Sequence, residues 1–159
     1  MKTRFFHSPF SALAFSFLVI ALGFISYVST GHDDSHITFW ASHTLLEQGE
    51  ILNYNGDRIE QSSTLLFTLL IAATAFVTTI NVIDSGYLLG IFFAGANIAM
   101  TLLVAQKAAI NRPVALAIIL ASSPSYLFWS FSGMETTLTA FCILAFIYSW
   151  DTFRERKSA

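Results

Sequence analysis

The stretch Y-L-L-G-I-F-F-A-G-A-N-I-A-M-T-L-L-V-A, Tyr87 to Ala105, contains no charged residue. An apolar run of about 18 or more residues is long enough to cross the hydrocarbon core of a membrane as a helix. Two other runs have this character, Phe10 to Val28 and Val114 to Phe131, and two weaker ones extend the pattern, Thr64 to Ile80 and Leu138 to Trp150. The sequence therefore predicts an all-α protein, a polytopic bundle of membrane helices.

Composition excludes a water-soluble domain. Of the 159 residues 55% are hydrophobic and only 11% are charged, whereas soluble domains carry roughly 25% charged residues. The formal net charge is −2, and no basic stripe indicates nucleic-acid binding. The single cysteine, Cys142, lies inside an apolar run and has no intrachain partner for a disulfide.

The placement of cations decides how many runs cross. If all five did, six cations would lie outside and two inside, against the usual excess of Lys and Arg in cytoplasmic loops. If 64–105 makes one net crossing, Arg58 lies outside and the others lie inside: Lys2, Arg4, Lys107, Arg112, Arg154, Arg156 and Lys157. We therefore predict spans at about 10–28, 64–105, 114–131 and 137–152, an outer loop at 29–63, and both termini in the cytoplasm.

One net crossing over 64–105 requires that one of its two runs lies at the interface or turns back within the protein. The bend is expected at the polar break, Asn81 to Gly86, on the outer side. Asp84 is then a solvated turn residue, because its charge would cost roughly 2.5 to 3.5 kcal/mol at the centre of a spanning helix. Pro124 is expected to kink its own run, since proline removes a backbone hydrogen bond.

The same topology returns Glu135 to the outer surface, together with Gly133 and Met134. Glu135 is the only charged residue between Pro113 and Trp150. Ionisable groups beside membrane helices are rare and are often functional. The alternative is that its carboxylate only stabilises the start of the last helix.

The outer loop shows helical periodicity from Asp34 to Gly49. One face is predicted to carry Ile37, Trp40, Ala41, Thr44, Leu45 and Gln48. This pattern predicts an amphipathic helix that lies on the membrane with Trp40 at the interface and that ends at Gly49. The stretch 53–57, N-Y-N-G-D, is typical of a turn, because asparagine and glycine tolerate positive φ.

Asp33 and Asp34 stand at the start of this helix. Of two adjacent carboxylates, one can act as a general base while the other stays charged and holds a metal or orients a sugar. The alternative is that one aspartate is simply the N-cap. Three nearby histidines lack a standard zinc-binding spacing: His32, His36 and His43. Arg58 either binds an anionic phosphate, reaches lipid headgroups, or pairs with Asp57 or Glu60.

Two segments resemble the GT-C superfamily of membrane glycosyltransferases. The run G-H-D-D-S-H-I-T-F-W, followed by a helix and by G-E-I-L-N-Y-N-G-D-R-I-E, lies between Gly31 and Leu70 and is similar to that superfamily's first outer loop. The closest type carries a pattern near G-x-D-D-A-[YF]-I-T-[FY] and then G-x-[IL]-[VL]-N-Y-N-G-[ED]-R-V-E. A second, weaker match is S-P-S-Y-L-F-W-S-F-S-G-M-E-T-T-L, Ser123 to Leu138, which resembles the later S-G-[LM]-E-T segment.

The resemblance implies transfer of a sugar from a polyprenyl-phosphate donor to an acceptor hydroxyl at the outer membrane face. Carried over by position, Asp33 and Asp34 supply the general base or orient the acceptor, and Glu135 is the second acidic element. Further substrate contacts are expected from His36, Trp40, Asn55 and Arg58. No metal ligand is assigned, the cofactor is unknown and a divalent cation stays open. The expected partners are the lipid-linked sugar and membrane lipids, with no nucleic acid.

The superfamily normally continues through further spans, so the resemblance implies that residues 1–159 are the N-terminal portion of a longer protein and inactive alone. A missing C-terminal portion or a partner subunit would complete it. Trp40 stands where many relatives have arginine, and His36 replaces a usual aromatic residue, so the donor-phosphate contacts are expected to differ. Whether the chain itself is an enzyme stays open. The alternative is a non-catalytic multi-span subunit that stabilises a partner protein; the expected location is a bacterial inner membrane.

Overall fold

A computed structural model describes residues 32–58 and 64–158, together with Phe10, Ala14, Phe17, Leu18 and Ile20 of the first apolar run. The rest of the predicted first span at 10–28, and the parts of the outer loop at 29–31 and 59–63, lie outside the described residues. Within the described ranges every regular element is a helix: α2 (Asp33–Gln48), α3 (Leu65–Thr78), α4 (Val82–Lys107), α5 (Pro113–Ala121), α6 (Pro124–Phe131) and α7 (Thr136–Ser158). The predicted all-α class is therefore confirmed for this part of the chain.

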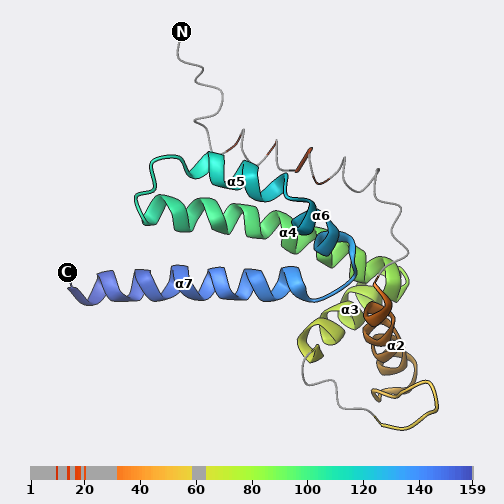
Figure 1. Cartoon of the computed structure of the whole chain (residues 1–159). Helices are drawn as coiled ribbons and strands as arrows, with labels where there is room; N and C mark the ends of the chain where they lie inside the picture. Colours follow the sequence, from red (N-terminus) through yellow and green to blue (C-terminus); the bar gives the residue numbers. More distant parts are fainter. Residues whose placement is uncertain are drawn as a thin grey trace.

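Helix α4 is the central element (Figure 1). Helix α7 lies alongside it and runs in the same direction, since Asn97 of α4 donates from Nδ2 to the carbonyl oxygen of Thr137 (2.9 Å) near the start of α7. At the other end Lys107 Nζ lies 3.0 Å from Glu155 Oε2. Helix α5 packs on the opposite flank of α4, and α2 and α3 gather at the end where α4 begins (Figure 1).

Two described helices, α4 and α7, are long and apolar enough to cross a membrane, and the bent pair of α5 and α6 makes a third if it forms one span. At a rise of about 1.5 Å per residue, α4 is about 39 Å long, against a hydrocarbon core of about 30 Å. Helix α3 has only 14 residues, so its length of about 21 Å falls short of that thickness. Of the two runs in 64–105, α4 is therefore the one with the length of a span.

The break between α3 and α4 lies earlier than the sequence predicted. It covers residues 79–81: Thr79 adopts a left-handed conformation (φ 62°), and Asn81 is the N-cap of α4. Asn81 Oδ1 accepts a hydrogen bond from the backbone N–H of Asp84 at 2.8 Å. Asp84 is exposed, as expected, but it lies in the first turn of α4 and not in the loop. The cap explains the shift, because it lets the helix begin within the polar stretch.

Pro124 begins α6, and the axes of α5 and α6 meet at 61°. Proline is well tolerated in the first turn of a helix, where its missing N–H has no intrahelical partner. The bend predicted for this run is thus present, in the form of two helices separated at Ser122 and Ser123.

Two apolar clusters hold the helices together. The first consists of Ile20, Ala94, Ile98, Leu102, Ala117, Ala121 and Phe131. Its alanines let helices α4 and α5 approach closely, as small residues do between membrane helices. The second consists of Phe39, Phe67, Ile71, Phe93 and Leu138, and it joins α2 and α3 to the rest of the chain.

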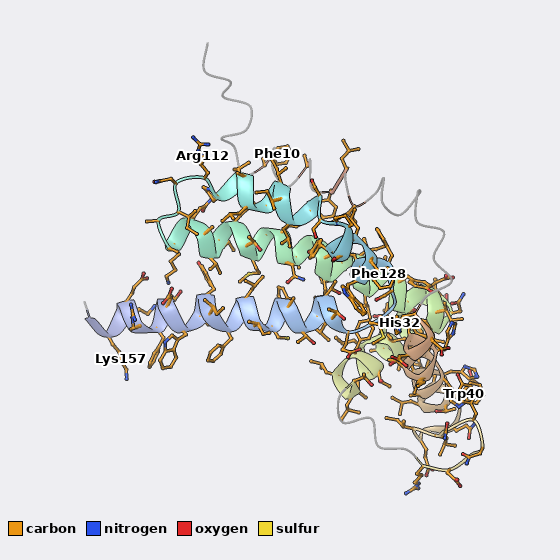
Figure 2. The ribbon with its side chains drawn as sticks, in the orientation of Figure 1. Phe10, His32, Trp40, Arg112, Phe128 and Lys157 are labelled. Atoms are coloured by element: carbon orange, nitrogen blue, oxygen red, sulfur yellow. The ribbon has the colours of Figure 1, made fainter. Side chains whose placement is uncertain are left out.

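The two ends of the molecule carry different residues. Arg112 and Lys157 lie at one end, and His32 and Trp40 lie at the other (Figure 2). At the basic end Lys157 Nζ lies 4.6 Å from the ring centre of Phe153, next to the exposed Trp150. Aromatic rings beside lysine and arginine are typical of the boundary between membrane and water.

Candidate functional site

The first turn of α2 holds the two candidate aspartates. His32, and neither aspartate, is the N-cap: its Nδ1 accepts a hydrogen bond from the backbone N–H of Asp34 at 3.4 Å. The interpretation of an aspartate as the cap is therefore wrong. Asp33 and Asp34 are the first two helical residues, and both are exposed. The unpaired N–H groups of a helix start stabilise such carboxylates.

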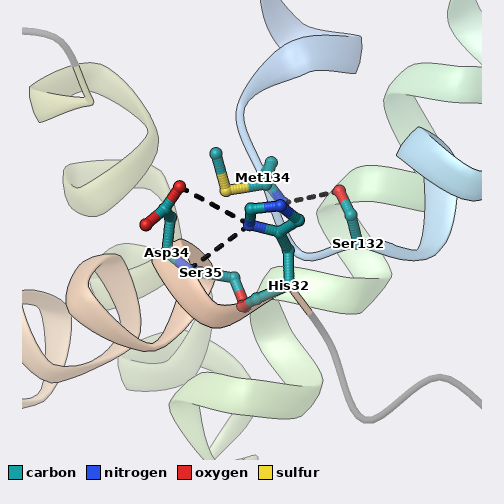
Figure 3. Close-up of polar contacts among 5 residues, drawn as sticks. All are labelled: His32, Asp34, Ser35, Ser132 and Met134. Carbon is teal, nitrogen blue, oxygen red and sulfur yellow. Dashed lines mark hydrogen bonds and ion pairs between the residues drawn. The ribbon is translucent and has the colours of Figure 1, made fainter.

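His32 connects this turn to the segment around Ser132. Its backbone N–H donates to the carbonyl oxygen of Ser132 at 3.2 Å. Its imidazole Nδ1 lies 3.6 Å from Asp34 Oδ2, and its ring centre lies 5.8 Å from that of Trp129. In the same place Met134 donates its backbone N–H to Ser132 Oγ at 3.2 Å (Figure 3). The start of the outer-loop helix is thus joined to a turn about 100 residues later in the chain.

The ring of Phe39 packs between α4 and the turn that follows Ser132, and so holds α2 against both. Its ring is 3% exposed and lies between Gly86 of α4 and Gly133 of the turn. A Cβ on Gly86 would lie 2.3 Å from Phe39 Cε1, and a Cβ on Gly133 would lie 2.5 Å from Phe39 Cζ. Gly133 also has φ 74°, a conformation that L side chains rarely adopt. Glycine is therefore required in the S-G-M-E segment both for its backbone and for the close approach of α2.

Glu135 follows this turn directly. It is half-buried, and its Oε2 atom is buried without a hydrogen-bond partner in the described part of the chain. A buried carboxylate oxygen without a donor is costly, since most buried polar atoms are paired. The structure thus brings the segment with Asp33 and Asp34 to the segment with Glu135.

The other candidate residues lie further along α2 and in the loop after it. The Trp40 ring stacks on Tyr54 with 4.8 Å between ring centres, and the hydroxyl of Tyr54 donates to the carbonyl oxygen of His36 at 3.3 Å. Asn55 Nδ2 donates to Asp57 Oδ2 at 2.7 Å. These contacts form a second group of residues, separate from the turn that holds the aspartates.

Arg58 has a partner that the sequence reasoning missed. Its guanidinium Nε donates to Glu50 Oε2 at 3.1 Å, and its Nη2 donates to Glu50 Oε1. The hydrogen bond and the charge of Glu50 raise the pKa of Arg58 above its ordinary value. Of the pairings considered from the sequence, Asp57 is not the partner, and Glu60 lies outside the described residues. The pairing follows from the turn at 53–57, which brings Leu52 and Arg58 into an antiparallel bridge.

The buried face of α2 also differs from the prediction. Ile37 is 46% exposed and Gln48 is exposed, whereas the buried positions are mostly small: Ser35, Thr38, Phe39, Ala41, Ser42 and Thr44. Ser42 Oγ donates to the carbonyl oxygens of Thr38 (2.8 Å) and Thr68 (3.1 Å), which ties α2 to α3. Packing against two helices selects small side chains at these positions, and hydrophobic periodicity does not detect that requirement.

A cavity of about 420 Å³ opens where α2 ends, beside the turn from α3 to α4. Its lining mixes apolar and polar residues: His43, Leu46, Glu47, Ala75, Phe76, Thr79, Ile80, Asn81 and Val82. The candidate site residues are absent from this lining. The feature of the sequence that points to this cavity is the pair His43 and Glu47, because residues four apart share one face of a helix.

Within residues 32–58 and 64–158, no group of three or more His, Cys, Asp and Glu side chains is placed to hold a metal ion. His32 and Asp34 form the only pair of such residues in the aspartate turn whose side chains are in contact there. No family model, curated protein or solved structure matches this chain.

Proposed function

We propose that this chain is the N-terminal module of an integral membrane glycosyltransferase, which transfers a sugar from a polyprenyl-phosphate donor to an acceptor hydroxyl at the outer face of a bacterial cytoplasmic membrane. The observation that carries the proposal is the contact between His32 and Ser132, with Phe39 fixed against Gly133. It joins the two segments whose sequences resemble the GT-C superfamily. Both segments carry the acidic residues that the proposed reaction needs.

The reaction requires a base and a means of orienting the acceptor. A carboxylate of Asp33 or Asp34 takes the proton of the acceptor hydroxyl. The hydroxyl oxygen then forms a bond to the anomeric carbon of the donor sugar, while the bond from that carbon to the phosphate oxygen breaks and polyprenyl phosphate leaves. Both aspartates are exposed and so can meet a water-borne acceptor. Among the described residues Glu135 Oε2 has no hydrogen-bond donor, and in the proposed reaction this carboxylate accepts a hydrogen bond from a hydroxyl of the substrate.

The distribution of charge supports the proposed orientation. Arg112 and Lys157 lie at the far end of the bundle from His32 (Figure 2), and the usual excess of cations in the cytoplasm would place the aspartate turn outside. Helix α4 connects the two ends and is long enough to cross the membrane. A carboxylate at the outer boundary can reach the aqueous acceptor while the lipid tail of the donor stays in the bilayer, so the membrane itself supplies proximity.

The test is a transfer assay in membranes in which the chain is present together with the C-terminal portion or partner subunit that completes it, using a radiolabelled polyprenyl-phosphate sugar. We expect Asp33→Asn or Asp34→Asn to lower transfer by roughly a hundredfold or more, because the loss of a general base removes about that factor. Asp84→Asn is the matched control, since Asp84 is also an exposed carboxylate in the first turn of a helix at the same end of the molecule. Full transfer by both aspartate variants at normal protein levels would refute the proposal and favour a non-catalytic subunit.

A further inference from the structure

Tyr54, on the loop after α2, stacks on Trp40 of that helix. The ring centres of Trp40 and Tyr54 are 4.8 Å apart and the ring planes meet at 25°. Tyr54 is nevertheless 62% exposed. Since the indole covers one face of the Tyr54 ring, the exposed surface must include the other face. The pair therefore presents a flat aromatic surface to its surroundings.

The backbone around Tyr54 holds this ring in place. Asn53 donates its N–H to the carbonyl oxygen of Asp57 at 2.8 Å, and Gly56 donates to that of Asn53 at 3.0 Å. Thr44 Oγ1 of α2 accepts from the backbone N–H of Leu52 at 3.1 Å, which anchors the loop to the helix. The tyrosine hydroxyl is itself bonded to the His36 carbonyl oxygen. An exposed ring fixed in this way loses little conformational freedom when a ligand binds to it.

The surroundings of the ring are polar. Asn53, Asn55 and Asp57 are all exposed. The ion pair of Arg58 with Glu50 lies beside them and is also exposed. Burying these polar side chains in the hydrocarbon of a membrane would cost the desolvation of two carboxylates, Glu50 and Asp57, and of the Arg58 guanidinium. The loop also lies at the extreme end of the molecule, away from α5 and α7 (Figure 1). These polar and charged residues favour water over hydrocarbon around the aromatic surface.

The indole N–H of Trp40 is a second unusual feature of this aromatic group. The indole Nε1 of Trp40 is buried and has no hydrogen-bond acceptor within the described part of the chain. Most buried N–H groups in proteins have a partner. Trp40 is also in ring contact with His43, at 5.7 Å between ring centres, so the unpaired donor lies within an aromatic group whose open side is Tyr54.

We propose that Tyr54, backed by Trp40, is a stacking platform for a neutral pyranose, and that it binds the saccharide acceptor of the proposed transferase. A pyranose has an apolar face of C–H groups that packs on an aromatic ring, while its hydroxyls bond to amides and carboxylates around the edge. The side chains of Asn53 and Asp57 provide those groups. The role as acceptor site rests on the proposed function, whereas saccharide binding itself does not.

The test is saturation-transfer NMR on the full chain in lipid nanodiscs, with three probes: methyl β-D-glucopyranoside, methyl β-D-galactopyranoside and methyl α-D-mannopyranoside. We expect transfer of saturation from the protein to the C–H protons of at least one probe. Tyr54→Ala should weaken that binding by roughly tenfold, the order of one aromatic contact. Tyr54→Phe keeps the ring and should keep the signal. Trp40→Phe keeps a ring behind Tyr54 and should keep most of the signal.

Phe153→Ala is the matched control, because Phe153 is also an exposed aromatic residue, 51% accessible, but lies at the basic end of α7. The proposal is overturned if no probe receives saturation, or if Tyr54→Ala binds as well as the parent chain. In a chain that also carries Trp129→Phe and Trp150→Phe, quenching of Trp40 fluorescence by brominated lipid without any saccharide signal would also overturn the proposal and assign the rings to membrane anchoring. The saccharide signal is measured without any sugar donor, so a failure of transfer is separable from a failure of binding.

Discussion

Three glycines allow a quantitative prediction about the packing of Phe39, because two of them contact its ring and the third does not. Gly133 has φ 74° and would place a Cβ 2.5 Å from Phe39 Cζ. Gly86 lies in a helix and would place a Cβ 2.3 Å from Phe39 Cε1, with no positive φ. Gly56 has φ 84° and no neighbour within 4 Å of a Cβ. The three positions therefore separate backbone strain from steric overlap.

The expected losses in free energy of unfolding follow from these differences. At Gly56, alanine costs only the left-handed conformation, about 1 to 2 kcal/mol. At Gly86, overpacking costs about 1 to 3 kcal/mol, less up to about 1 kcal/mol that alanine gains in a helix. At Gly133 both penalties apply, so Gly133→Ala should cost about 2 to 5 kcal/mol. It should be the most destabilising of the three.

The assay is equilibrium unfolding in mixed micelles with an increasing fraction of dodecyl sulfate, for each alanine variant alone and combined with Phe39→Leu. A smaller side chain at residue 39 should recover the steric part of the loss at Gly86 and Gly133 and nothing at Gly56. If Gly133→Ala costs no more than Gly56→Ala, or if Phe39→Leu rescues neither neighbour, Phe39 does not fix α2 against the turn and the geometry of the proposed site is wrong.

Three further predictions concern single groups. His32→Ala should lower stability by roughly 0.5 to 1 kcal/mol and His32→Asn should restore it, since asparagine is a good N-cap; equal unfolding curves for the two variants would contradict the capping role. The pKa of Arg58 is raised by Glu50, so its contribution to the loop is present at neutral pH and is lost only when the pH rises through that elevated value. The NMR shifts of the 53–57 turn should therefore not change between about pH 7 and pH 9, and a transition in that interval would count against the pair. In a Cys142→Ser background, Asn55→Cys should react with an impermeant maleimide from outside and Arg156→Cys only after permeabilisation; the reverse pattern would invert the proposed orientation.

Much of the helical structure could be predicted because its signals are local. The end of α2 at Gly49 follows from one residue with a left-handed conformation, φ 74°. The turn at 53–57 follows from asparagine and glycine, and the structure contains it, with Gly56 at φ 84°. The apolar runs predicted α4 and α7, since a helix that is apolar all around needs no knowledge of its neighbours.

The orientation of α2 was not predictable in the same way. A search for an apolar face selects Ile37, which is exposed, and passes over Ser35 and Ser42, which are buried. Ser42 is buried because α3 comes close enough for the carbonyl oxygen of Thr68 to accept its hydrogen bond, and Ser35 is buried against the turn at Gly133. The identity of the N-cap was missed for a related reason, because His32 is held by the carbonyl oxygen of a residue in a distant turn.

The candidate site shows the same division between local and distant causes. The sequence supplies the acidic residues, but it contains no sign that Phe39 fits between a glycine of α4 and a glycine of the later turn. Gly86 and Gly133 are far apart in the chain, and each alone is an ordinary helix or turn residue. Together they make a slot for one ring of α2, and that slot fixes Asp33 and Asp34, less than two turns of helix before Phe39, beside the segment of Glu135. A substitution at either glycine should therefore move the aspartates without touching them, which separates the positioning of the proposed base from its chemistry.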